Sequence, residues 1–257
     1  MESEVLDLIC DPDTRYSFEL DENTLRNTAT GRVYPIRDGI PLFVSSLKGP
    51  DLKYQAMYDR IAPGYDVTER LYRFLSRKPD LRPEMLRELE LKPGARVLEV
   101  GVGTGINLSY LPASIEFYGV DISWGMLKKC NRNLKRWGRK GRLFQAEASR
   151  LPFRAEVFDA VFHITGLNYF TFRERAIKEM IWVTKHGGRV VIVDEIPAVL
   201  RAHGDAAGAQ AASANSKTAL DLIPAEMEDV RVRELGEGKY YCVSFRKPMP
   251  AEDAYEI

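Results

Sequence analysis

The sequence predicts an α/β fold in which helices pack on a mostly parallel β-sheet, with a small β-rich module in front of it. Three observations favour this fold. A short apolar run, residues 97–100, is followed by glycine at every second position and then by a helix-like run from Ile106. Strand-like and helix-like stretches alternate over residues 93–195, which is typical of a parallel sheet. Two further strand-like stretches on either side of Gly236 and Gly238 predict a terminal hairpin.

Composition limits the class of protein. With 257 residues, 45% of them hydrophobic, the chain can bury a sizeable core in one large or two small domains. A formal net charge of zero argues against an obligatory nucleic-acid partner but leaves a local charged patch open. Three cysteines far apart in sequence indicate reduced thiols, so we expect a cytoplasmic protein. The start of the chain is acidic, unlike a signal peptide, and no run approaches the ~20 apolar residues that a membrane span needs.

Four segments differ in pattern. Residues 1–46 read as a β-rich module, with a hairpin signal at Asp38-Gly39. Residues 47–92 read as helical, residues 93–248 carry the alternating pattern, and residues 249–257 form a tail. The expected apolar helix faces in the second segment consist of Tyr54, Met57, Tyr58 and Ile61, then Leu71, Tyr72, Phe74 and Leu75, then Met85, Leu86 and Leu89.

The core elements follow in order along the chain. We expect strands over residues 97–100, 116–120, 143–146, 157–163 and 189–194, and helices over 122–137 and 173–184. A turn at residues 186–188 should precede the fifth strand. Strands over residues 230–234 and 240–245 complete the hairpin.

The glycine pattern distinguishes two cofactor families. Residues 99–105 read E-V-G-V-G-T-G, and Ile106 stands where a dinucleotide-binding G-x-G-x-x-G turn has its third glycine. The stretch resembles motif I of the class I S-adenosylmethionine-dependent methyltransferases. That resemblance, which covers most of residues 54–195, implies a Rossmann-like, mostly parallel seven-stranded sheet with a C-terminal antiparallel hairpin. It also implies S-adenosylmethionine as the cofactor and S-adenosylhomocysteine as the product.

The cofactor side of the predicted site depends on Asp121. It ends the second strand about 20 residues after the first glycine, where a carboxylate can accept from both ribose hydroxyls; the alternative role is a helix N-cap. Residues 146–153 resemble the adenine-binding loop of the family, which implies that Glu147 accepts from the adenine amino group and that the Ala148 N–H donates to the ring. Ile122 and Met126 would then flank the purine, or else belong to the ordinary core.

Two tyrosines are candidates for the methionine end of the cofactor. Residues 58–66, Y-D-R-I-A-P-G-Y-D, resemble the segment before motif I in quinone-type C-methyltransferases and their small-molecule relatives. The resemblance implies a lid with an aromatic contact, from Tyr58 or Tyr65; the alternative is helix packing. Glu99 either fixes the glycine loop or meets the methionine ammonium.

The acceptor side begins at the end of the fourth strand. Residues 158–163 resemble motif IV, and ligands of open parallel sheets bind outside the carboxyl ends of the strands. His163, Asn168 and Tyr169 are therefore the candidate catalytic residues, with His163 a general base, a cofactor contact or a structural residue. The predicted cofactor-binding residues are Tyr58, Tyr65, Glu99, Gly101, Gly103, Gly105, Asp121, Ile122, Met126, Glu147, Ala148 and His163.

The N-terminal module carries a specific string. Residues 34–43, Y-P-I-R-D-G-I-P-L-F, resemble the end of a small zinc-ribbon-like family whose members occur alone, or fused to and activating methyltransferases. The positions that match the family's four zinc ligands are Cys10, Asp13, Asn27 and Thr30. One thiol, one carboxylate and two neutral groups make a poor zinc site, so we expect a degenerate module without metal.

Three functions agree with these patterns. The first is methyl transfer to a small molecule, with a quinone-like or lipid-like ring as one candidate. The second is RNA methylation, suggested by the N-terminal module and by the basic residues 128–142. The third is a protein that binds the cofactor, or a partner methyltransferase, without turnover. The basic stretch also suggests peripheral contact with a membrane, with a solvated helix face as the plain alternative.

Overall fold

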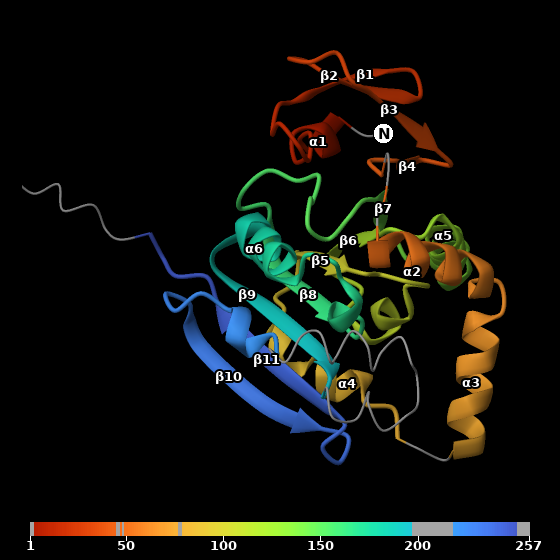
Figure 1. The fold of residues 1–257 in the computed structure, drawn as a ribbon, viewed down its shortest axis with the longest axis vertical. Coiled ribbons are helices and arrows are strands. Elements are labelled where there is room, and N and C mark those ends of the chain that lie inside the picture. Colours follow the sequence, from red (N-terminus) through yellow and green to blue (C-terminus); the bar gives the residue numbers. More distant parts are fainter. Residues whose placement is uncertain (1–2, 45–46, 48, 77–78, 197–217, 251–257) are drawn as a thin grey trace, which may run out of the picture.

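The computed structural model describes residues 3–44, 47, 49–76, 79–196 and 218–250. Its main sheet has seven strands in the order β10-β11-β9-β8-β5-β6-β7 (Figure 1). β5, β6, β7, β8 and β9 run parallel, while β11 is antiparallel to β9 and β10 to β11, so the predicted fold and terminal hairpin are confirmed. The strands span Arg96–Val100 (β5), Glu116–Asp121 (β6), Arg142–Gln145 (β7), Phe158–Ile164 (β8), Thr184–Glu195 (β9), Glu228–Leu235 (β10) and Tyr240–Arg246 (β11).

Helices cover both faces of this sheet. Successive strand residues point to opposite faces, and Val97 and Leu98 accordingly belong to different apolar clusters. The Val97 cluster includes Leu127 of α5 (Trp124–Trp137), and the Leu98 cluster includes Ile177 of α6 (Arg173–Val183). The two helices therefore lie on opposite sides of the sheet (Figure 1).

Three predicted elements differ in detail. The run from Ile106 forms only a short 3₁₀ helix, η2 (Ile106–Tyr110). The expected turn at residues 186–188 lies inside β9 as an irregularity, because Phe158 pairs with Thr184 while Ala160 already pairs with Arg189. α5 starts after Ser123, whose side chain accepts from the Met126 N–H, so Ser123 is its N-cap and Asp121 is not.

Helices precede the sheet as expected, but one of them exposes its apolar face. They are α2 (Gly49–Ile61), α3 (Tyr65–Ser76) and α4 (Arg82–Met85), followed by the 3₁₀ helix η1 (Arg87–Leu89). Met85 and Leu89 are buried in the core. Of the apolar face predicted for α3, Leu71, Phe74 and Leu75 are all exposed, and the side chain of Tyr72 lies outside the described part of the structure.

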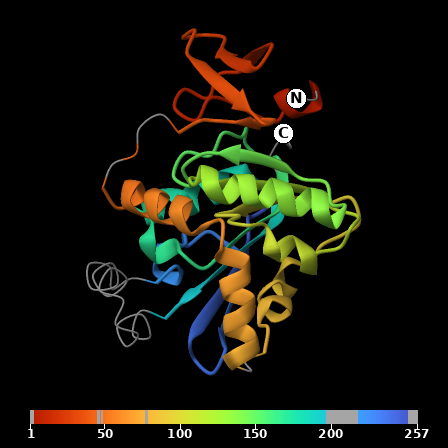
Figure 2. The same cartoon turned by 90° about the vertical axis from the view of Figure 1, so that its right-hand side faces the viewer.

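The N-terminal module is a four-stranded antiparallel sheet that sits against the edge strand β7 (Figure 2). The Phe43 N–H donates to the Gln145 carbonyl at 2.8 Å, and the Cys10 N–H donates to the Pro152 carbonyl at 3.1 Å. Phe43 also belongs to the same apolar cluster as Phe144 of β7, so the N-terminal module and the main sheet share one hydrophobic core. The module contains α1 (Ser3–Leu6), β1 (Phe18–Asp21), β2 (Thr24–Asn27), β3 (Val33–Arg37) and β4 (Ile40–Pro41).

Two similar turns contain the positions that match the zinc ligands of the related family. The buried Asp11 accepts from the N–H groups of residues 13 and 14, and the buried Asn27 accepts from those of residues 29 and 30, all at 2.9 Å. Asn27 Nδ2 donates to Thr14 Oγ1 at 2.8 Å, which ties the turns together. The first turn therefore begins at Asp11, one residue after the matched position Cys10, whereas the second begins at the matched position Asn27. Among the described residues, no group of three or more His, Cys, Asp or Glu could hold a metal ion.

Candidate active site

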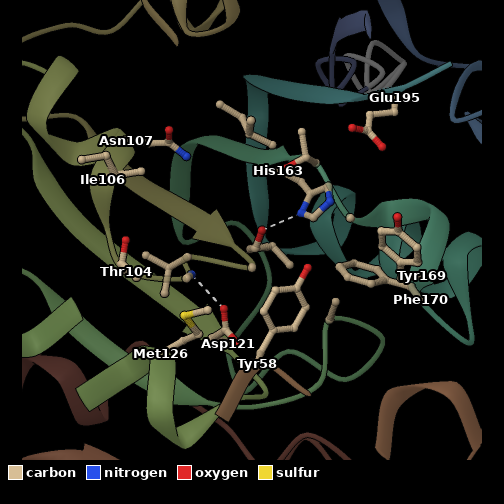
Figure 3. A pocket seen from close by; sticks show the side chains of 18 of the residues that line it. Tyr58, Thr104, Ile106, Asn107, Asp121, Met126, His163, Tyr169, Phe170 and Glu195 are labelled. Atoms are coloured by element: carbon tan, nitrogen blue, oxygen red, sulfur yellow. Dashed lines mark hydrogen bonds between the residues drawn. The ribbon is translucent and has the colours of Figure 1, made fainter. Parts of the chain in front are cut away.

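A cavity of about 640 Å³ opens at the carboxyl ends of the central strands. The last residues of β5, β6, β8 and β9 form its floor, and α2 and α3 contribute side chains from above. Figure 3 shows Asp121 on one side of the cavity, His163, Tyr169 and Phe170 on the other, and Tyr58 between them. This is the edge of the sheet at which the sequence predicted the site.

The glycine loop after β5 needs its glycines for backbone conformation and space. Gly101, Gly103 and Gly105 all have positive φ, between 52° and 77°. A Cβ at residue 105 would lie 2.6 Å from the Cys130 sulfur, so α5 packs directly on the loop. Gly101 and Gly103 line the cavity, whereas Gly105 serves this packing contact.

Asp121 fixes the loop and faces the cavity. One carboxylate oxygen accepts from the Gly103 N–H and the other from the Ser123 N–H, both at 2.8 Å. Burial raises the pKa of Asp121 to about 6, against the lowering effect of these backbone hydrogen bonds. Each oxygen keeps a further lone pair for a ligand hydroxyl.

α2 is held against the start of α5 by groups that the sequence did not reveal. Asp59 Oδ1 accepts from the Ser123 hydroxyl and the Gly125 N–H, each at 2.6 Å. A Cβ at Gly125 would lie 2.9 Å from Asp59 Cα, so only glycine allows this approach. Gln55 and Gln145 both donate to the Ile122 carbonyl at 2.9 Å.

A chain of polar side chains runs from Glu99 to α3. The buried Glu99 accepts from Asn107 Nδ2 at 2.6 Å, and Arg82 Nε donates to Asn107 Oδ1 at 3.1 Å. Arg82 also forms ion pairs with Asp80 and Glu69. Glu99 Oε2 has no hydrogen-bond partner among the described residues, and burial raises the pKa of Glu99 to about 8. Asn107 and Arg82 line the cavity, but Glu99 lies behind the wall.

His163 ends β8 with its ring buried beside the cavity. Nδ1 donates to the Val100 carbonyl at 2.7 Å, and the ring lies 5.0 Å from that of Phe170. Nε2 is buried and has no partner among the described residues. Burial lowers the pKa of His163 to about 4, so the imidazole is neutral at pH 7 and Nε2 is an acceptor.

The half of the cavity beyond His163 is aromatic. The rings of Tyr54 and Tyr169 lie 4.7 Å apart, and Phe170 and Phe172 line the same wall. Burial raises the pKa of Tyr58 and Tyr65, so both hydroxyls stay protonated at neutral pH. This half can enclose a flat apolar ring with only a few polar contacts.

A buried carboxylate shapes the loop after β8. Asp194 accepts from the N–H groups of Gly166 at 3.1 Å and Asn168 at 2.8 Å, and Asn168 Nδ2 donates to the Glu195 carbonyl at 3.1 Å. Burial raises the pKa of Asp194 to about 6. Asn168 therefore fixes the loop and does not line the cavity, while Tyr169 and Glu195 do.

The structure brings most of the predicted residues to one cavity. Its wall includes Tyr58, Tyr65, Gly101, Gly103, Asp121, Ile122, Met126, Glu147, Ala148, His163 and Tyr169, but not Glu99, Gly105 or Asn168. Glu147 is ion-paired with Arg150, which also pairs with Asp13 at 3.0 Å. Sequence reasoning missed Arg82, Asp59 and Glu195, because each is joined to the site by contacts between distant segments.

The donor set suits an adenosine with a charged amino-acid tail. The open glycine loop and Asp121 can take a ribose. A cation bound nearby would favour the ionised form of Glu99, whose Oε2 has no hydrogen-bond partner among the described residues. The apolar side chains of Ile122 and Met126 line the wall beside Asp121, where a purine can pack. The residues present therefore fit the cofactor that the motif implies.

Comparisons with known proteins agree with this fold. Residues 98–192 match the family model described as a methyltransferase domain. A demethylmenaquinone methyltransferase of Renibacterium salmoninarum is 34% identical over 148 residues, which are 57% of this chain and 60% of that protein. The chain thus matches less than two thirds of the length of that relative.

Solved structures share the fold at low sequence identity. A methyltransferase of Thermotoga maritima superposes with a TM-score of 0.57 at 21% identity, over 75% of this chain and 99% of the other. The [4+2]-cyclase SpnF superposes with a TM-score of 0.59 at 17% identity, over 83% of this chain and 100% of the other. Because one of these is named a cyclase, the fold alone does not establish the reaction.

The family match and the motif residues together identify the domain. The matched region begins at Leu98 in β5 and ends at Ile192 in β9, so it contains the glycine loop, Asp121 and His163. Residues 98–192 are thus an S-adenosylmethionine-dependent methyltransferase domain, and its cofactor is S-adenosylmethionine.

Proposed function

We propose that the chain transfers a methyl group from S-adenosylmethionine to a small acceptor with a quinone-like or lipid-like ring. The observation that carries the proposal is a single cavity with a polar half at Asp121 and an aromatic half at Tyr169. The relative named demethylmenaquinone methyltransferase supports an acceptor of this class. None of the described helices is long and apolar enough to cross a bilayer.

The residues divide into two groups in this proposal. Asp121 binds the ribose, and Ile122 and Met126 flank the purine. The Ala148 N–H donates to the adenine ring, and Glu147 accepts from the adenine amino group. Arg82 and Asn107 lie at the end of the cavity where the methionine part would extend. Tyr58 and Tyr65 cover the reacting centre from the helical side.

His163 acts as a hydrogen-bond acceptor in this proposal. S-adenosylmethionine supplies an electrophilic sulfonium methyl group that a nucleophile attacks. The free Nε2 can accept from a hydroxyl of the acceptor and orient it, but a pKa of about 4 makes the imidazole a weak base. Alignment of the acceptor is therefore the main contribution, and it can supply up to about 7–11 kcal/mol of the barrier.

Labelled methyl transfer tests the proposal. The protein is incubated with methyl-labelled S-adenosylmethionine and either a panel of reduced benzo- and naphthoquinones or total tRNA and rRNA. We expect label in a quinol, with an equal amount of S-adenosylhomocysteine. Label in RNA would support the alternative of an RNA methyltransferase, which the cations of α5 favour. Binding of S-adenosylhomocysteine in calorimetry with no turnover on any acceptor would support a non-catalytic partner protein, and tight binding of NAD alone would contradict the cofactor assignment.

A further inference from the structure

Helix α3 separates the cavity from the outside of the molecule and has two unlike faces. Tyr65 and Glu69 line the cavity, and Glu69 pairs with Arg82. Asp66 faces α5, where Asn133 Nδ2 donates to it at 2.9 Å and Lys129 lies 3.6 Å away. Both acidic residues of α3 are thus turned inward and partnered.

The outer face of α3 is apolar and exposed. Val67, Leu71, Phe74 and Leu75 recur at helical spacing and are 66%, 54%, 79% and 69% exposed. On the preceding helix α2, Leu52, Met57 and Ile61 are 51%, 41% and 40% exposed. A contiguous apolar helix face in water is unfavourable and usually marks an interaction site.

Cations lie on α5, the helix that α3 contacts through Asp66. The charged residue that α3 turns outward among its described side chains is Arg70. Four exposed cations on α5, together with Lys140 after its end, form no ion pair with any carboxylate in the described part of the chain; the four are Lys128, Arg132, Lys135 and Arg136. Lys128, Arg132 and Lys135 also line a groove beside the N-terminal module, together with Asp38. α2, α3 and α5 lie on the same side of the molecule, which faces the viewer in Figure 2.

We propose that this surface, the outer face of α3 together with the exposed cations of α5, docks on an anionic lipid bilayer. A helix with an aliphatic and aromatic face inserts that face at the level of the headgroups, and neighbouring cations attract acidic lipids. The inward pairing of Asp66 and Glu69 removes the negative charges that would oppose such contact.

Other occupants fit this surface less well. RNA phosphates would use the cations of α5 but would leave Val67, Leu71 and Leu75 in contact with charge and water. A two-fold contact with a second copy would bring the same unpaired cations together, and their repulsion would oppose it. A bilayer with acidic headgroups satisfies both parts of the surface.

Docking would place a wall of the active-site cavity at the membrane surface. A lipid-like acceptor could then reach the cavity from the bilayer, a consequence that depends on the proposed function. Docking itself does not depend on methyl transfer, so it can be measured without turnover.

Flotation with vesicles tests the proposal on the full-length protein. One set contains phosphatidylglycerol mixed with phosphatidylcholine, and the other contains phosphatidylcholine alone. We expect binding to the anionic vesicles that weakens as salt rises. Leu71→Glu/Phe74→Glu should lower the partition coefficient at least tenfold, because both side chains lose apolar contact with the lipid.

Charge reversal on α5 gives the second arm. Lys128→Glu/Arg132→Glu should lower the partition coefficient at least 25-fold, since each cation near an anionic surface contributes about fivefold. The matched controls keep binding: Val232→Glu replaces an apolar residue of β10 that is 51% exposed, and Arg175→Glu/Lys178→Glu reverses two exposed charges on α6.

Three results would overturn the proposal. They are no binding to anionic vesicles, equal binding by the α3 variant and the wild type, and sedimentation as a dimer that the α3 substitutions dissociate. Tight binding of RNA without vesicle binding would assign the α5 cations to RNA. Calorimetry with S-adenosylhomocysteine on the same samples distinguishes the two proposals. A protein that does not bind the cofactor contradicts the proposed function, whereas vesicle binding alone decides the docking proposal.

Discussion

At the scale of single residues, Asp121 performs two tasks with one carboxylate. It holds the glycine loop through the Gly103 N–H and the turn into α5 through the Ser123 N–H. The sequence predicted its place at the strand end, since motif spacing is local. The contact of this turn with α2 could not be predicted, because Asp59 accepts from the Ser123 hydroxyl across 64 residues of chain.

Replacement of Asp121 tests its contact with the cofactor. Asp121→Ala should weaken S-adenosylhomocysteine binding by roughly 1.5–3 kcal/mol, the usual loss for hydrogen bonds to a charged acceptor. Asp121→Asn, which keeps one acceptor oxygen, should lose less. Calorimetric titration measures both, and thermal unfolding checks that the variants are folded. An unchanged dissociation constant for the alanine variant would place the ribose contact elsewhere.

Glu99 gives a prediction about pH. Its folded pKa of about 8 lies above the unfolded value near 4.5, so its contribution to stability is present below pH 4.5 and is lost as pH rises through 8. Glu99→Gln keeps the neutral form at every pH. We expect the variant to match the wild type near pH 5 and to exceed it by about 2–5 kcal/mol near pH 8.5, since one pKa unit is about 1.36 kcal/mol.

Denaturant unfolding of both proteins at several pH values measures this difference. His163 changes stability in the opposite sense, because its lowered pKa makes the folded state less stable as pH falls from 6.5 to 4. That effect is common to both proteins and cancels in the comparison. A difference in the free energy of unfolding that does not vary with pH would contradict a buried, protonated Glu99.

At the scale of elements, local patterns predicted the core strands well and the helical segment less well. The strands β5, β6, β7 and β8 lie within one or two residues of their predicted positions, because short apolar runs bounded by turn residues are typical of buried strands. The apolar residues of α3 share one face as predicted, yet that face is exposed. Periodicity shows which residues share a face but not which neighbour covers it.

The lid role of α2 and α3 can be measured by hydrogen exchange. Residues 54–70 should exchange more slowly with S-adenosylhomocysteine bound, because Tyr58 and Tyr65 gain a ligand to pack against. Asp59→Ala should speed exchange in α2 without ligand, since it removes the two hydrogen bonds to the start of α5. α6 provides an internal reference that should not change. Equal protection with and without ligand would mean that this segment is a fixed wall.

At the scale of the whole molecule, the N-terminal module completes the edge of the sheet. Without it, β7 would present unpaired backbone groups and Phe144 to water, a known liability of edge strands. The sequence predicted a separate small module, but no local pattern indicated that this module docks on β7. Such docking depends on pairing between segments about 100 residues apart, as for Phe43 and Gln145.

Substitution in the module should therefore destabilise the methyltransferase core. Phe43→Ala removes a buried ring and should cost about 3–5 kcal/mol. Trp137 lies on α5, whereas Trp124 and Trp182 are contacted by Arg37 and Arg15 of the module, so the fluorescence of a protein that keeps only Trp137 follows unfolding of the core. We expect its transition to shift with Phe43→Ala and to stay in place with Val33→Ala, which changes an exposed residue. If Phe43→Ala leaves the unfolding transition of the core unchanged, the module unfolds independently of the core.

The central claim is that one cavity holds the cofactor and the acceptor side by side. A crystal structure of the protein with S-adenosylhomocysteine tests it most directly. We expect the ribose hydroxyls on Asp121, the adenine against Ile122 and Met126, and the sulfur facing the half of the cavity lined by His163 and Tyr169. A ligand bound outside this cavity, or one whose sulfur points away from His163 and Tyr169, would contradict the account.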